Sequence, residues 1–72
     1  MKLKWKPYEE SLYIAHGTIG KFQIGRNEKG KFTVGIRAKG SGLFLVVART
    51  DTLGEAKKFS QSFENNSEYV DI

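Results

Sequence analysis

The chain has 72 residues, 39% of them hydrophobic and 12% aromatic, a composition that excludes intrinsic disorder and predicts one small domain over residues 1–72. It has no cysteine, which excludes a disulfide framework, a thiol nucleophile and a thiolate zinc site. The longest apolar run, residues 43–48, is too short for a membrane span or a signal-peptide core, so we expect a cytoplasmic protein.

The net charge of +4 is unevenly distributed along the chain. Residues 1–49 carry ten basic and three acidic residues, a net of +7, whereas residues 50–72 carry two basic and five acidic residues, a net of −3. A basic surface therefore belongs to the first two-thirds of the chain. Such asymmetry indicates an anionic partner, although lysines also serve solubility and the protection of sheet edges.

Residues 1–10 form an N-terminal arm in which lysine alternates with apolar residues, followed by a short strand predicted over residues 12–16. The arm has two interpretations. Trp5 can pack on a thin core, or the arm can become ordered on nucleic acid. We expect packing, because a single tryptophan contributes a large fraction of the apolar area that so short a chain can bury.

Two alternating segments, residues 21–26 and 31–38, predict a β-hairpin with one buried face. Asn27 and Gly30 suit a type I turn followed by a left-handed glycine, the common three-residue hairpin loop. For the apolar residues of both strands to share a face, the two residue numbers of each cross-strand pair must sum to 58. That register places Gln23 opposite Gly35.

The third strand of the meander, residues 43–50, is apolar at consecutive positions, as expected of a strand that is covered on both faces or that carries an interaction surface. Strict alternation would place three residues on the inner face: Phe44, Val46 and Ala48. It would place three others on the outer face: Leu43, Leu45 and Val47.

After residue 50 the apolar period changes from two to that of a helix. Thr52 and Glu55 suit a capping box, and a helix is predicted over residues 52–65, followed by an acidic tail at residues 66–72. The expected core-facing residues of this helix are Leu53, Ala56, Phe59, Ser60 and Phe63. The predicted fold is α+β: a three- to four-stranded antiparallel β-meander (residues 11–50) with one C-terminal α-helix packed on one face.

Catalytic machinery is nearly absent from the sequence. The single histidine, His16, has no evident partner, and no phosphate loop or oxygen-rich metal loop is present. We therefore expect a protein that is not an enzyme and that uses no cofactor, metal, small-molecule substrate or membrane.

The outer face of the sheet carries the clearest functional signal. Arg and Lys beside Gln and Thr are the side chains that contact phosphates and base edges, and a sheet can enter a major groove. The residues expected to bind nucleic acid are Lys21, Gln23, Lys31, Thr33, Arg37, Lys39 and Arg49.

The same face supports a second interpretation, a protein interface. The alternation places Phe22, Phe32 and Phe44 inward, so the outer face lacks stacking aromatics, while the third strand makes it apolar. The interface would consist of Leu43, Leu45, Val47 and Trp5. Its partner would be a second copy of the chain or a host enzyme.

Three features together resemble small phage and prophage proteins of uncharacterised role: Trp5, the segment at residues 13–17, and the helix start at residues 52–57. The topology is also similar to the amino-terminal arm-binding domains of phage and transposon integrases, in which the sheet face reads the major groove. This resemblance implies DNA contacts from Lys21, Gln23, Lys31, Thr33, Arg37 and Arg49.

Overall fold

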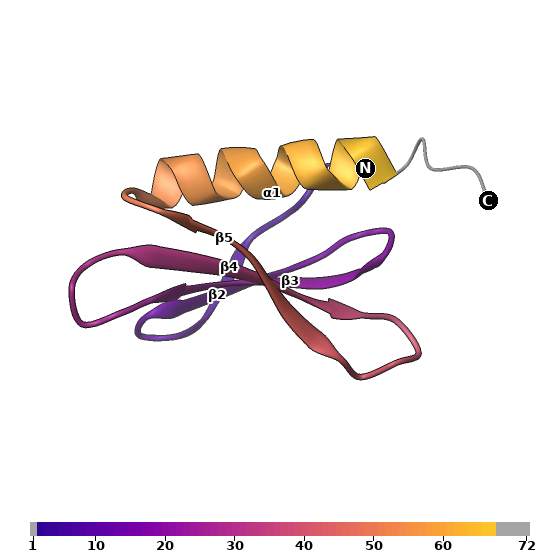
Figure 1. Ribbon diagram of the computed structural model, residues 1–72, viewed down its shortest axis with the longest axis horizontal. Helices are drawn as coiled ribbons and strands as arrows, with labels where there is room; N and C mark the ends of the chain where they lie inside the picture. The colour runs from indigo at the N-terminus through magenta and orange to yellow at the C-terminus, as the bar shows by residue number, and fades with distance from the viewer. Residues whose placement is uncertain (1, 68–72) are drawn as a thin grey trace.

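The computed structural model describes residues 2–67 and shows an antiparallel meander with one helix across one face (Figure 1). The five strands pair in chain order: β1 Lys6–Glu9, β2 Leu12–His16, β3 Gly20–Arg26, β4 Phe32–Ala38 and β5 Phe44–Thr50. Helix α1 spans Leu53–Ser67. The α+β class and the C-terminal helix are confirmed, with five strands in place of the expected three to four.

The additional strand, β1, comes from the segment that the sequence predicts to be an N-terminal arm. Leu3 is 5% exposed, and its N–H donates to Oε1 of Gln61 on α1 at 2.7 Å. Trp5 packs against both clusters of the core, which confirms the packing interpretation. The chain then pairs as β1 along β2, so most of the arm is built into the domain.

The β3–β4 hairpin has the predicted register, with Gln23 opposite Gly35. Gly30 has a φ of 79°, and the Asn27 N–H bonds the Lys31 carbonyl at 2.9 Å. The Asn27 Oδ1 accepts the backbone N–H groups of Lys29 and Lys31 at 2.9 and 3.0 Å. Face parity and turn chemistry therefore define this hairpin locally.

Strand β5 departs from the predicted alternation at a β-bulge. Val34 lies opposite Ala48, as expected, but Gly35 lies opposite Val46, so Val47 is an extra residue in β5. Val47 packs against both core clusters. The prediction that Val47 belongs to the outer face is therefore wrong, because one inserted residue reverses the faces of the strand that precedes it.

Before the bulge, the two faces of β5 are exchanged. Phe44 lies over Gly35 on the outer face, beside Arg37, and the prediction that it points inward is wrong. Leu45 lies opposite the buried Ile36, on the helix side, yet it remains 61% exposed. Figure 1 shows why: the tip of the β4–β5 hairpin turns away from α1.

Helix α1 begins at the expected cap. The Glu55 N–H donates to the Thr52 hydroxyl oxygen at 3.1 Å, and that hydroxyl donates to Glu55 Oε1 at 3.1 Å. The helix continues two residues beyond the predicted end, and residues 68–72 of the expected acidic tail lie outside the described residues. Within residues 2–67, no helix is long and apolar enough to cross a membrane.

The buried face of α1 follows a spacing of four residues: Ala56, Ser60 and Glu64 are each 0% exposed. The sequence predicts Phe59 on this face, but Phe59 is 37% exposed, and its ring is tilted by 40° to the Phe63 ring with 6.1 Å between the ring centres. The buried face of α1 is therefore centred on Ala56, Ser60 and Glu64, and Phe59 lies at its margin. The buried Glu64 carboxylate accepts the N–H and the hydroxyl of Thr18 and ties α1 to the β2–β3 turn.

The core lies between this helix face and the sheet, in two adjoining clusters. One contains Leu3, Ala15, Phe22 and Ile36. The other contains Ile24, Val34 and Ala56. The side chains of the sheet that alternate with these point to the opposite side, which we call the outer face.

Candidate nucleic-acid interface

A row of side chains crosses four strands of the outer face. His16 lies opposite Lys21, Lys21 opposite Arg37, and Arg37 opposite Phe44. Four adjacent strands span about 14 Å, so the three basic groups of this row lie side by side across the sheet. We call this set of four residues the basic row.

The four strands that the basic row crosses contain no acidic residue to compensate its charge. Strands β2–β5 contain four Lys and Arg residues and no Asp or Glu. Like charges directly opposite one another on neighbouring strands destabilise a sheet. The Lys21–Arg37 pair is therefore unfavourable for the isolated fold and favourable for binding an anion.

Arg37 is positioned by its neighbours. One guanidinium nitrogen, Nη1, donates to the Gly42 carbonyl at 2.8 Å, and its Cζ lies 5.6 Å from the centre of the Phe44 ring. A cation over an aromatic face gains about 0.5–1 kcal/mol at an exposed site. The basic row thus ends in a pre-oriented guanidinium beside an aromatic ring, a feature that strict alternation would not place on this face.

Two further rows complete the outer face. Gln23 and Thr33 are half-buried and lie in two successive rows on one side of the basic row, while Arg49 is exposed opposite Thr33. A Cβ added at Gly25 would meet only a Leu12 methyl at 4.0 Å, so the backbone at Gly25 is not covered by other side chains. The space above Gly35, in contrast, is filled by the Phe44 ring.

Two of the seven predicted contact residues lie apart from this surface. Lys31 sits at the end of the β3–β4 hairpin and forms an ion pair with Asp51. Lys39 lies in the β4–β5 turn, where its N–H donates to the Ile19 carbonyl at 3.0 Å. The structure therefore brings five of the seven together: Lys21, Gln23, Thr33, Arg37 and Arg49.

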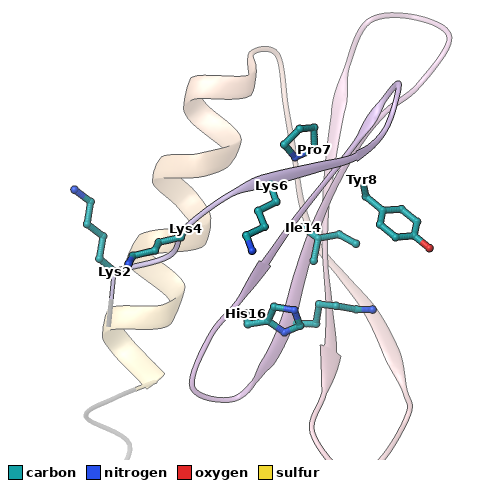
Figure 2. Close-up of a pocket in the computed structure, with 8 residues that line it drawn as sticks. Lys2, Lys4, Lys6, Pro7, Tyr8, Ile14 and His16 are labelled. Carbon is teal, nitrogen blue, oxygen red and sulfur yellow. The ribbon is translucent and has the colours of Figure 1, made fainter.

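Beside the basic row lies a groove of about 540 Å³ that the sequence interpretation did not identify (Figure 2). It is lined by Lys2, Lys4, Lys6, Pro7, Tyr8, Ile14, His16 and Lys21. We call it the lysine groove. The sequence feature that could have indicated this groove is the alternation of lysine with Leu3 and Trp5. Because Leu3 and Trp5 pack against the core, the lysines that alternate with them are left on the side away from the core.

The proposed protein interface is also rearranged. Val47 and Trp5 pack against the core, so they are not available as a surface pair. Four consecutive exposed apolar residues lie instead at the beginning of the edge strand and just before it: Leu43 (66%), Phe44 (43%), Leu45 (61%) and Val46 (48%).

Within residues 2–67, no three His, Asp or Glu side chains lie together in a way that could hold a metal ion. Comparison with models of protein families, with curated proteins and with solved structures finds no match to this chain.

Proposed function

We propose that this protein is a non-enzymatic binding domain that engages nucleic acid through the outer face of its sheet. The observation that carries the proposal is the basic row, in which His16, Lys21 and Arg37 lie in register across strands that contain no carboxylate. Proteins keep locally unfavourable arrangements chiefly at functional sites. A phosphate backbone would relieve the repulsion between Lys21 and Arg37.

Binding of this kind depends strongly on salt. Each phosphate neutralised by a cation releases bound counterions, so the affinity falls steeply as salt rises. At 50 mM salt one such contact is worth on the order of tenfold in affinity. Gln23 and Thr33 add hydrogen-bonding groups next to the cations, and Arg49 extends the positive surface along β5.

The test is fluorescence anisotropy of labelled oligonucleotides, single-stranded and duplex, at 50 mM salt. We expect Arg37→Glu and Lys21→Glu to weaken binding by about tenfold or more. Lys58→Glu makes the same charge change as Lys21→Glu at an exposed position of α1 and should leave binding nearly unchanged. Thermal unfolding of each variant checks that the fold is kept.

The proposal fails if the wild-type protein binds neither form of nucleic acid at this salt concentration. It also fails if Lys58→Glu weakens binding as much as Lys21→Glu does, because the net charge alone would then account for the effect.

A second candidate function is self-association through β5, which is favoured by the exposed apolar residues at positions 43–46. Both edge strands contain a β-bulge, but β5 has no Pro or Lys, whereas the opposite edge, β1, carries Lys6 and Pro7. Lysine and proline protect an edge strand such as β1 against pairing with another chain, whereas an edge strand without them, such as β5, is open to such pairing. Antiparallel pairing of two β5 strands would keep both outer faces on one side.

Self-association is tested by light scattering coupled to gel filtration over a range of protein concentrations. A dimer that Leu45→Asp converts to a monomer, with oligonucleotide affinity per chain retained, would support it. A wild-type protein that is monomeric at about 1 mM, the weak end of specific affinities, would exclude it.

A further inference from the structure

We infer that the lysine groove is a binding site for single-stranded nucleic acid, so that the ligand of the outer face is a single strand and not a duplex. This inference rests on the function proposed above and specifies its substrate. The groove adjoins the basic row and shares His16 and Lys21 with it.

The groove lysines are held by the core and do not belong to a free arm. Lys2 and Lys4 flank Leu3, whose side chain is buried and whose N–H is bonded to Gln61. Lys4 and Lys6 flank Trp5, which packs against both core clusters. Anchoring at alternate positions fixes the backbone of the segment, so little backbone entropy remains to be lost on binding.

Four lysines and a histidine line one cavity, and none of the lining residues within the described range 2–67 is an aspartate or glutamate. In Figure 2 the Lys6, Ile14 and His16 side chains lie between the N-terminal segment and the neighbouring strands, with Tyr8 at one end. A site of this charge selects an anion, and the spacing of its cations along an extended segment suits a chain of phosphates better than a single one.

The apolar part of the lining decides between single strand and duplex. Ile14, Pro7 and Tyr8 contribute apolar surface to a cavity of about 540 Å³, within the range of about 300–1,000 Å³ that is typical of small-ligand sites. A duplex keeps its bases stacked inside and presents phosphates at its surface. A single strand can place an unstacked base in the cavity, and Tyr8, 68% exposed, offers a ring for stacking.

The outer face continues this arrangement across the sheet. Tyr8 lies at the β1 edge and Phe44 at the β5 edge, and Lys21 and Arg37 lie between them on β3 and β4. Cations that follow a backbone, with aromatic rings on which bases stack, are the recurring features of single-strand binding surfaces.

The experiment measures binding of a labelled single-stranded oligonucleotide of about 12 nucleotides, a length within the usual range of such sites, and of the same sequence as a duplex. Four groove and control variants are compared with the wild-type chain: Tyr8→Ala, Tyr8→Phe, Lys4→Glu and Lys29→Glu. Lys29 lies in the exposed β3–β4 turn and gives the same charge change as Lys4 outside the groove.

We expect the wild-type chain to bind the single strand at least tenfold more tightly than the duplex. Tyr8→Ala should weaken single-strand binding by about five- to a hundredfold, the effect of one stacked base, and leave duplex binding unchanged. Tyr8→Phe should bind as the wild type does. Lys4→Glu should weaken binding by about tenfold and Lys29→Glu by much less.

Equal affinity for single strand and duplex, with no effect of Tyr8→Ala or Lys4→Glu, would overturn the inference. If Arg37→Glu still weakens binding by about tenfold or more in that case, the proposed function stands and only the groove assignment fails. If the wild-type chain binds no oligonucleotide, both fail. Because Tyr8 and Lys4 are exposed, these variants should keep the wild-type melting temperature, and loss of binding can be assigned to the groove.

Discussion

The contact between Gly35 and Phe44 provides a direct test of how β5 is placed on the sheet. An alanine Cβ at position 35 would lie 2.1 Å from the Phe44 Cζ, and 2.7 and 2.9 Å from two other ring atoms. Carbon atoms in contact are normally about 3.5–4.0 Å apart, so Gly35→Ala must displace the ring by about 1.5 Å or more. The ring can yield, because Phe44 is 43% exposed.

The cost of this displacement can be estimated from the area involved. A little more than half of Phe44 is buried, about 110 Å² of an aromatic side chain of about 200 Å². At about 25 cal/mol per Å², complete loss would cost about 3 kcal/mol, an upper bound. A partial retreat, offset by about 0.4–1 kcal/mol from the reduced freedom of the unfolded chain, leaves about 1–2 kcal/mol of destabilisation for Gly35→Ala. For a domain of this size that lowers the melting temperature by about 5–15 °C.

The assay is a double-mutant cycle followed by urea and thermal unfolding. We expect Gly35→Ala to be destabilising in the wild-type chain and neutral or stabilising in the Phe44→Ala background, because the clash is then absent. The reasoning is refuted if Gly35→Ala costs the same in both backgrounds. It is refuted equally if Phe44→Ala alone costs about 3–5 kcal/mol, the loss expected of a phenylalanine in the core.

Four further substitutions test the fold. Gly20→Ala would place its Cβ 2.2 Å from a backbone oxygen of β4, which cannot move without breaking the ladder, so urea unfolding should show a loss of about 3 kcal/mol or more. Gly25→Ala, in the same strand but with open space above it, should be neutral or raise the melting temperature by a few degrees, about 0.5 kcal/mol. Glu64→Ala should cost about 1–3 kcal/mol and speed amide exchange at Thr18, and an unchanged exchange rate would contradict the coupling of α1 to the β2–β3 turn. Thr52→Ala should cost about 1 kcal/mol through the lost cap, which helical circular dichroism during unfolding would detect.

Local chemistry was sufficient to predict the β3–β4 hairpin and the start of the helix. Asn27 and Gly30 specify the turn, and the turn and the alternation of apolar residues agree on one register. The hydroxyl of Thr52 caps the helix within one turn of chain. In both cases the groups that decide the structure are near neighbours in sequence, so no distant contact is needed to choose between alternatives.

The face of β5 could not be predicted in this way. A strand that is apolar at consecutive positions has no period from which to assign a phase, and one extra residue, Val47, reverses the face of every residue before it. The bulge brings Phe44 to the outer face and turns Val47 into the core. Its position is decided by how β5 packs against β4 and α1, which are separate segments of the chain.

The sequence by itself determined that strands β2–β5 carry basic and no acidic side chains, and that Lys21 and Arg37 face each other across a hairpin. Tertiary structure decided what surrounds that pair. Lys31 is paired with Asp51 at the far end of β5, and the lysines of the N-terminal segment reach the sheet because Leu3 and Trp5 pack against residues far along the chain. Net charge follows from composition alone, but the concentration of charge at one groove depends on contacts between distant segments, which only the folded chain provides.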